Sequence, residues 1–219
     1  KGGKGDFHVK NRISVDLIIF DLDGTLVESS KDIAWSVNKT LMDIGFDELP
    51  YEVIKSYIGW GVKMLLEQAI PTERHNILDD AREIFLKYYE GHLLIDTYLY
   101  PGVKDVLEYF KEKKLAIITN KPIGLTQKVL DGLSISKYFQ QVIGGDTIPN
   151  KKPSPDAIDF LLKELSIKPE KTIFVGDSKI DIEAGKNCYC CNRSPGREGK
   201  AEHDEKACKA WPYQGRSRH

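Results

Sequence analysis

The chain has 219 residues, of which 41% are hydrophobic and 30% charged, and its formal net charge is -1. This is the composition of an ordinary globular protein, and the length suits one large domain or a domain with an insertion. The balanced charge offers no basic field for nucleic acid, and no apolar run is long enough to span a membrane. We therefore expect neither nucleic acid nor a membrane among its partners.

The cysteines are confined to the end of the chain, at Cys188, Cys190, Cys191 and Cys208. Such a distribution gives no disulfide framework and favours a reducing compartment, so we expect a cytoplasmic protein. Residues 1–13 are basic and lack an apolar signal core, which predicts a flexible lead-in.

The first predicted element is a short, apolar and β-branched strand over residues 14–20. From residue 31 to about residue 90 the pattern becomes helical, within a stretch that runs to about residue 98. The first helix of this stretch carries one apolar face, made of Ile33, Val37, Leu41 and Ile44. The stretch is too long for a loop, so we interpret it as an inserted helical unit.

Alternating helices and strands follow the insertion. A helix is predicted to start at Pro101, with an apolar face made of Val103, Val106, Leu107 and Phe110. Further strands are predicted at residues 115–120, 140–146 and 171–177, and further helices at 123–133, at 154–165 and from residue 181.

This order of elements predicts an α/β fold. Alternating strand–helix units favour a parallel sheet covered by helices on both faces, here a Rossmann-like three-layer core with an inserted α-helical cap domain. We assign residues 14–30 and 99–187 to the core domain and 31–98 to the cap. Residues 188–219 are polar and poor in aliphatic side chains, which predicts a disordered tail.

Polar residues collect where the predicted strands end. They are Asp21, Asp23, Gly24 and Thr25 after the first strand, Thr119, Asn120 and Lys121 after the second, and Asp177, Ser178 and Asp181 after the fourth. Ligands of parallel sheets bind at the carboxyl ends of the strands. Carboxylates clustered there repel one another unless a cation neutralises them, and oxygen ligands beside a phosphate suit Mg²⁺.

Four segments carry a family resemblance. The segments DLDGT, IITNKP, KKPSPD and VGDSKID occur in the order and at the strand ends typical of the haloacid dehalogenase superfamily. Over about residues 14–187 the chain resembles the phosphoglycolate-phosphatase-type members, which have a helical cap.

The resemblance implies a two-step phosphoryl transfer. Asp21 would be the nucleophile, and Asp23 would protonate the leaving group and then deprotonate water. The carbonyl of Asp23 would bind Mg²⁺ beside the carboxylates of Asp21 and Asp177. Thr119 would bind a phosphate oxygen, and Lys152 would neutralise the phosphoryl charge.

Other residues would support this centre. Gly24 would ease a tight turn that lets Asp21 and Asp23 face one phosphate. We expect Gly24, Thr25 and Asn120 to contribute to substrate binding, and Ser178 and Asp181 to orient the metal ligands.

Simpler explanations remain open for these residues. The aspartates and the Thr119–Asn120 pair are of types that form turns and strand ends, and Asp181 suits the first turn of a helix. Lys151 and Lys152 are adjacent, and the Lys-Pro pattern of the family selects Lys152.

The segment at residues 57–63 interrupts the helical pattern with two glycines. One explanation is a turn between two helices. The other is a substrate-specificity loop, in which Gly59, Trp60 and Gly61 approach the substrate and Trp60 and Lys63 contact a carboxylate or exclude water.

The resemblance stops after Asn187. The family continues with an apolar strand beside the fourth predicted strand, so its loss would expose that flank. A reading-frame change near Asn187 would explain this, because a shifted reading of the cysteine-rich codons gives an apolar stretch. A zinc site made of Cys188, Cys191, His203 and Cys208 is an alternative, and cysteines without function are another.

Together these features predict a Mg²⁺-dependent phosphatase of small phosphate monoesters, with 2-phosphoglycolate favoured and an aspartyl-phosphate intermediate. The alternatives are a pyrophosphatase, a sugar-phosphate phosphatase or phosphomutase of the same fold, or a catalytically impaired phosphate-binding protein. The expected partner is a small phosphorylated metabolite, and the expected assembly is a monomer or homodimer.

Overall fold

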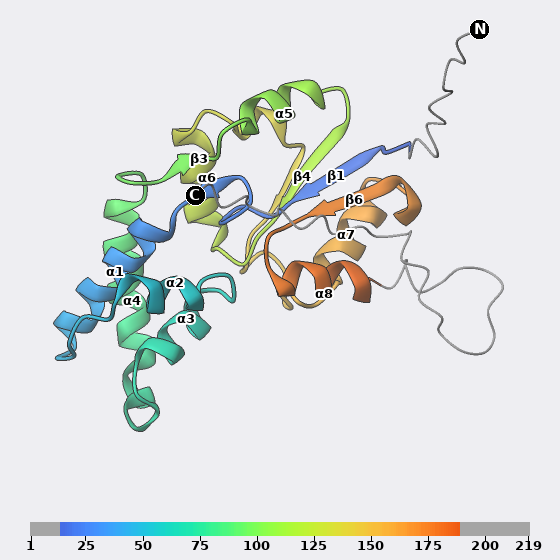
Figure 1. Cartoon of the computed structure of the whole chain (residues 1–219). Coiled ribbons are helices and arrows are strands. Elements are labelled where there is room, and N and C mark those ends of the chain that lie inside the picture. The colour runs from blue at the N-terminus through green and yellow to red at the C-terminus, as the bar shows by residue number, and fades with distance from the viewer. Residues whose placement is uncertain (1–13, 189–219) are drawn as a thin grey trace, which may run out of the picture.

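The computed structural model describes residues 14–188, and its centre is a parallel sheet (Figure 1). Within these residues the sheet has four strands in the order β5-β4-β1-β6. They are β1 (Leu17–Phe20), β4 (Lys114–Ile118), β5 (Gln141–Ile143) and β6 (Thr172–Val175). In the register of the sheet, Leu17 lies opposite Lys114 on one side and Thr172 on the other. Each of the four predicted strands is thus confirmed.

Helices cover both faces of this sheet. Ile18 and Phe20 of β1 point to one face, where they pack with α5 (Val103–Tyr109) and α6 (Ile123–Gly132). Leu17 and Ile19 point to the other face, where they pack with α7 (Asp156–Glu164) and α8 (Lys179–Asn187). The alternation along β1 therefore feeds two separate hydrophobic clusters, which confirms the predicted three-layer α/β fold.

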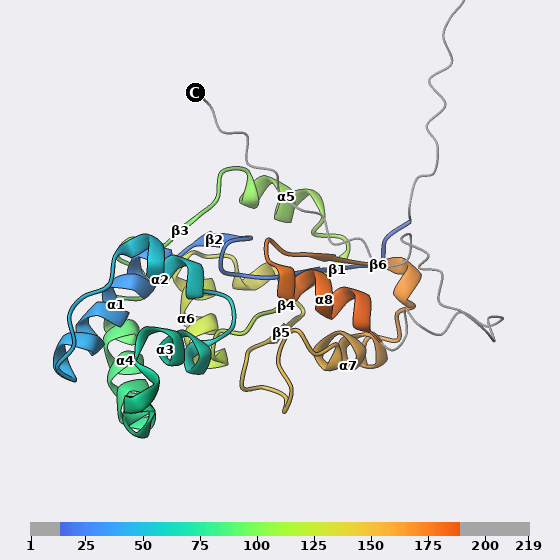
Figure 2. The same cartoon turned by 60° about the horizontal axis from the view of Figure 1, so that its bottom comes forward.

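A helical segment lies to one side of the sheet (Figure 2). It contains α1 (Ser30–Asp43), α2 (Tyr51–Tyr57), α3 (Val62–Ala69), a 3₁₀ turn (η1, Thr72–Ile77) and α4 (Leu78–His92). α4 packs against α1 and α3. Two shorter 3₁₀ turns lie outside this segment, η2 (Ser136–Tyr138) and η3 (Pro169–Lys171).

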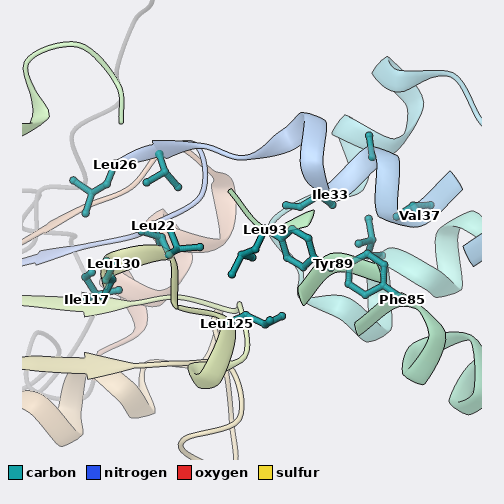
Figure 3. Close-up of a cluster of buried hydrophobic side chains, with 14 of the residues drawn as sticks. Leu22, Leu26, Ile33, Val37, Phe85, Tyr89, Leu93, Ile117, Leu125 and Leu130 are labelled. Carbon is teal, nitrogen blue, oxygen red and sulfur yellow. The ribbon is translucent and has the colours of Figure 1, made fainter. Parts of the chain in front are cut away.

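One hydrophobic cluster continues from the sheet into the helical segment (Figure 3). Leu22 and Leu125 lie on the sheet side of this cluster, and Ile33, Phe85 and Tyr89 lie on the side of the helical segment. Their burial removes a continuous apolar surface from water, which holds the helical segment against the core.

The connection between the two parts is a feature that the sequence pattern did not predict. β2 (Val27–Glu28) and β3 (Tyr98–Leu99) form an antiparallel pair where the chain leaves the core and returns to it. Just beyond β2, the fully buried Asp32 carboxylate accepts hydrogen bonds from the Asp96 backbone N–H and the Thr97 hydroxyl. These bonds tie the start of the helical segment to its end.

Helix α5 differs from the prediction. It begins at Val103, preceded by Gly102 at a φ of +84°, rather than at Pro101. Val103 and Leu107 are buried as expected, whereas Val106 is 43% exposed. The expected position of Val106 on the buried face was therefore wrong, because this short helix buries a narrower stripe than the apolar pattern suggested.

The described chain ends beside β6. Within residues 14–188, β6 is an edge strand, so the flank where the family places a further strand is open there. Cys188 is buried against the α7 and α8 side of the sheet. The predictions of a flexible lead-in at 1–13, a disordered tail, a changed reading frame and a zinc site with Cys191, His203 and Cys208 concern residues outside the described ones.

None of the helices between residues 14 and 188 combines the length and the apolar character needed to traverse a lipid bilayer.

Candidate active site

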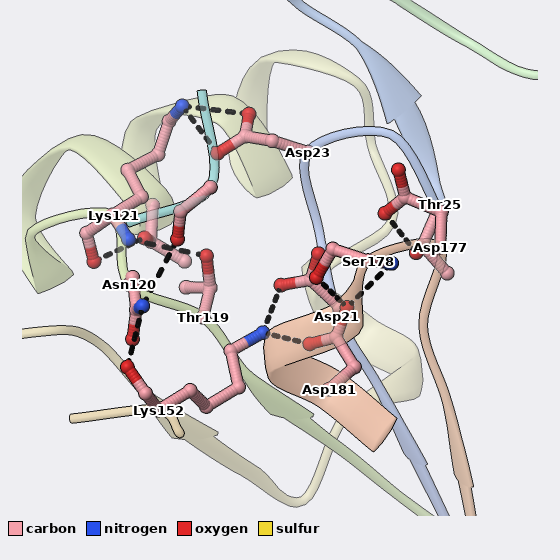
Figure 4. Close-up of polar contacts among 12 residues, drawn as sticks. Asp21, Asp23, Thr25, Thr119, Asn120, Lys121, Lys152, Asp177, Ser178 and Asp181 are labelled. Atoms are coloured by element: carbon pink, nitrogen blue, oxygen red, sulfur yellow. Dashed lines mark hydrogen bonds and ion pairs between the residues drawn. The ribbon is translucent and has the colours of Figure 1, made fainter. Parts of the chain in front are cut away.

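The carboxyl end of β1 places Asp21 in a buried ion pair. Lys152 Nζ donates to Asp21 Oδ1 at 2.6 Å and to Asp181 Oδ1 at 2.6 Å (Figure 4). All three residues are buried. Asp181 belongs to the first turn of α8, and its Oδ2 accepts hydrogen bonds from the Ser178 backbone N–H and hydroxyl. Thus β1, the segment before α7 and the start of α8 meet at one point.

Burial controls the charge state of this group. Desolvation raises the pKa of Asp21 to about 7, while Lys152 opposes the rise and the neighbouring carboxylate of Asp181 adds to it. Burial also acts to lower the pKa of Lys152, but Asp21 and Asp181 raise it above its ordinary value. One lysine therefore offsets the charge of two carboxylates only in part.

A third carboxylate joins them from the end of β6. Carboxylate oxygens of Asp21, Asp177 and Asp181 all lie within 4.8 Å of one another. Asp177 accepts a hydrogen bond from the Thr25 hydroxyl at 3.1 Å. Gly24 has a φ of +89°, and a Cβ there would lie 2.4 Å from Asp177 Oδ2. The turn after β1 can approach Asp177 this closely only because position 24 is a glycine.

Asp23 takes part in a second charged group. Its carboxylate is turned toward Lys121, whose Nζ donates to Oδ1 at 2.7 Å and to Oδ2 at 2.8 Å (Figure 4). The Ser29 hydroxyl donates to the same carboxylate at 2.5 Å, and Lys121 also donates to the Tyr89 hydroxyl at 2.6 Å. Burial acts to lower the pKa of Lys121, but Asp23 and Tyr89 together raise it above its ordinary value.

The end of β4 supplies Thr119 and Asn120, both buried. Thr119 Oγ1 accepts a hydrogen bond from the Lys121 backbone N–H at 3.2 Å. Asn120 Nδ2 donates to the Gly59 carbonyl at 2.9 Å and to the Lys152 carbonyl at 3.0 Å. These two bonds fix the orientation of the amide and leave its buried Oδ1 without a partner in the described part of the chain.

A cavity of about 50 Å³ lies between the sheet edge and the helical segment. Its polar lining comes from the core and consists of Asp21, Asp23, Thr119, Asn120 and Lys121, with Pro122 beside them. Its remaining lining comes from the helical segment and consists of Ile33, Ile58, Gly59, Gly61, Val62, Leu65, Phe85 and Tyr89. The polar groups of the core thus face a largely apolar wall across the cavity.

The predicted site residues at the ends of the strands lie together, but only some residues of the predicted loop at 57–63 line the cavity. Gly59 and Gly61 line the cavity, and a Cβ on Gly61 would lie 2.8 Å from Lys151 Nζ. Trp60 is 37% exposed and is not among the lining residues. Lys63 pairs with Glu67 at 3.7 Å on the surface. A substrate contact by Trp60 or Lys63 therefore stays a prediction.

The sequence argument gave no role in this site to Lys121 or Tyr89. Lys121 directly follows the Thr119–Asn120 pair and belongs to the IITNKP segment. Nothing in the sequence indicated that this lysine is buried. Tyr89 lies on α4 and is buried, where its hydroxyl contacts Lys121. Its place in the helical pattern indicated only a core side chain.

The chain is similar in sequence to known phosphoglycolate phosphatases. It is 42% identical over 172 residues to the phosphoglycolate phosphatase of Aquifex aeolicus (strain VF5), covering 78% of this chain and 79% of that protein. It is 39% identical over 180 residues to the phosphoglycolate phosphatase of Colwellia psychrerythraea (strain 34H), covering 78% and 80%.

A solved structure and a family model agree with these relatives. The crystal structure of a predicted phosphoglycolate phosphatase from Haemophilus somnus 129pt superposes with a TM-score of 0.74 at 34% identity, covering 78% of this chain and 80% of that one. The model of the haloacid dehalogenase-like hydrolases matches residues 18–191. The chain therefore belongs to the haloacid dehalogenase-like hydrolase family and, within it, is a phosphoric monoester hydrolase.

Proposed function

We propose that this protein hydrolyses small phosphate monoesters through a phosphorylated Asp21, with Mg²⁺ as cofactor and 2-phosphoglycolate as the favoured substrate. The observation that carries the proposal is the convergence of Asp21, Asp177 and Lys152 from separate segments at one edge of the sheet. The relatives named as phosphoglycolate phosphatases support the choice of substrate. The small cavity also favours a small ester.

The proposed reaction has two steps. In the first, a carboxylate oxygen of Asp21 attacks phosphorus, the ester P–O bond breaks, and the leaving oxygen takes a proton from Asp23. In the second, water attacks phosphorus and gives a proton to Asp23. The bond between Asp21 and phosphorus then breaks, which releases inorganic phosphate and restores both carboxyl groups.

The residues fit a divalent cation. Three carboxylates within 4.8 Å of one another, with one lysine to offset them, form a strongly negative cluster of hard oxygen donors. We propose that Asp21, Asp177 and the Asp23 carbonyl hold Mg²⁺. When bound, the ion would supply positive charge that stabilises the transferring phosphoryl group.

The remaining polar residues would orient the reaction. In this proposal Lys152 keeps Asp21 ionised and meets the phosphoryl charge, while Thr119 donates to a phosphate oxygen. Asp181 holds Lys152 from the opposite side and is in turn held by Ser178. Gly24, Thr25 and Asn120 shape the turn and the cavity next to the phosphate.

We further propose that residues 31–98 act as a cap over a core made of residues 14–30 and 99–187. Support comes from the cavity, because Gly59 and Gly61 of the loop between α2 and α3 line it beside core residues. Asn120 links this loop to the core through its bond to the Gly59 carbonyl. We also propose a monomer or homodimer that acts on a phosphorylated metabolite in the cytoplasm. The absence of cysteine from the first 187 residues supports the cytoplasmic location.

Release of p-nitrophenol from p-nitrophenyl phosphate, measured with and without Mg²⁺, tests this proposal. We expect Mg²⁺-dependent turnover that Asp21→Asn lowers by about 1000-fold or more. Asp16→Asn, an exposed carboxylate at the opposite end of β1, is the matched control and should keep full activity. Binding of a phosphate analogue without turnover would instead identify a catalytically impaired binding protein.

A panel of phosphorylated compounds then tests the substrate. The highest kcat/KM is expected for 2-phosphoglycolate, with lower values for sugar phosphates and pyrophosphate. A clear preference for pyrophosphate or a sugar phosphate would refute the substrate assignment while leaving the phosphatase chemistry intact.

A further inference from the structure

Lys121 makes an unusual set of contacts for a lysine that the proposed reaction does not use. Its ammonium group has three N–H donors. Two of them meet the two oxygens of the Asp23 carboxylate, at 2.7 and 2.8 Å, and the third meets the Tyr89 hydroxyl at 2.6 Å. The side chain of Lys121 is only 3% exposed. All its donors are thus occupied inside the protein.

We propose that Lys121 is a positioning residue for Asp23 and that Tyr89 of α4 holds Lys121 in place. The inference rests on the proposed function, because it concerns the residue to which that function gives the proton transfers. It adds that the direction of the Asp23 carboxylate is set by a lysine from the end of β4 and a hydroxyl from the helical segment.

The geometry favours positioning over binding of a substrate carboxylate. A lysine that recognises a substrate keeps donors directed into the cavity, whereas every donor of Lys121 already has a protein partner at short distance. The carboxylate it holds is also fixed from a second direction by the Ser29 hydroxyl. Because Lys121 and Ser29 both donate to its carboxylate oxygens, the Asp23 side chain has one preferred orientation.

Tyr89 makes this arrangement depend on the helical segment. It is buried in α4, its hydroxyl accepts from Lys121 Nζ at 2.6 Å, and its ring centroid lies 4.8 Å from the same nitrogen. If α4 withdrew from the core, Lys121 would lose its third partner and Asp23 its fixed neighbour. Correct orientation of Asp23 therefore requires α4 to be docked.

The test measures kcat and KM for 2-phosphoglycolate and for ethyl phosphate, which lacks a carboxylate. Lys121→Met keeps the length of the side chain and removes its donors, and we expect kcat to fall about 10- to 100-fold on both substrates with KM changed less than about 3-fold. Tyr89→Phe keeps the ring and removes one hydroxyl, and it should lower kcat about 2- to 5-fold. Lys121→Arg, which retains the charge, should recover part of the loss.

The matched control is Lys128→Met. Lys128 of α6 forms an exposed ion pair with Glu90 of α4, so it links the same two parts of the chain without touching the cavity. This variant should leave kcat unchanged. In an Asp23→Asn background, Lys121→Met should lower kcat less than 2-fold further, because the carboxylate that Lys121 orients is already absent.

Several results would overturn the inference. One is a rise in KM confined to 2-phosphoglycolate, which would make Lys121 a substrate-binding residue. Others are unchanged kcat in Tyr89→Phe and Lys121→Met, or a full further loss in the Asp23→Asn background. If the unmodified protein shows no turnover that depends on Asp21, the proposed function fails; if it does and these variants behave otherwise than expected, only the role of Lys121 fails.

Discussion

Replacing Asp181 by asparagine is the most direct test of how the buried charges are arranged. Both Asp181 oxygens are used, since Oδ1 accepts from Lys152 and Oδ2 accepts from the Ser178 backbone N–H and hydroxyl. An asparagine has the same shape but only one acceptor oxygen. Whichever way its amide turns, the NH₂ group faces either the Lys152 ammonium or the Ser178 N–H.

The expected cost follows from that conflict. Asp181 is fully buried, so the lost bond cannot be replaced by bulk water. A hydrogen bond to a charged group contributes about 1.5 to 3 kcal/mol, and we expect the free energy of unfolding to fall by this amount. Lys152 keeps its other partner, Asp21, which is why the full penalty of an unpaired buried charge is not expected.

Urea unfolding without divalent cations, followed by circular dichroism, measures the effect. At a slope of about 2 kcal/mol per molar urea, the midpoint should move down by about 1 M. Asp80→Asn is the matched control, because Asp80 is an exposed acidic residue in the first turn of α4 and makes the same chemical change at a helix start. It should cost about 0.3 to 1 kcal/mol. Equal midpoints for Asp181→Asn and the unmodified protein would refute the argument from acceptor count.

Three further predictions follow from the same site. Gly24→Ala should weaken Mg²⁺ binding at least 10-fold in a calorimetric titration, because the new Cβ would force the Asp177 carboxylate away; unchanged affinity would contradict this placement of the metal. Asn120→Asp should lower the free energy of unfolding by about 1 to 3 kcal/mol, since an oxygen would then face the Gly59 and Lys152 carbonyls, and an unaltered melting curve would disprove the bridging role. Addition of Mg²⁺ at about 100 times its dissociation constant should raise the free energy of unfolding by about 2.7 kcal/mol, and chelation should reverse this. A urea unfolding midpoint that is the same with and without Mg²⁺ would argue against the metal site.

The sequence predicted the sheet well because its strands are short apolar runs that end in distinctive polar residues. β1 and β6 carry Asp21 and Asp177 at their carboxyl ends, so parallel pairing alone was enough to bring these carboxylates together. The helices on each side of the Gly59–Gly61 interruption were likewise predicted from their periodicity. These features depend on local pattern and on one general rule of sheet architecture.

Other features depend on contacts between distant segments and were not predictable in this way. β2 and β3 are two residues each, too short for a periodic signal, and they pair across the whole helical segment. The bonds of Asn120 to Gly59 and Lys152 join three separate segments. The pairing of Asp23 with Lys121 is of the same kind, because nothing in the order of residues distinguishes a buried lysine from a solvated one.

The division of the cavity lining has a consequence for how such an enzyme changes its substrate. The two carboxyl groups and the lysine of the lining belong to the ends of β1 and β4, whereas Ile33, Val62, Leu65 and Phe85 come from the helical segment. Exchange of one aliphatic or aromatic residue for another there would alter which leaving group is admitted without disturbing the charges that handle phosphorus. Under the proposed function, such exchanges would tune selectivity while the phosphoryl chemistry is preserved, except at Tyr89, the residue of the helical segment that contacts Lys121.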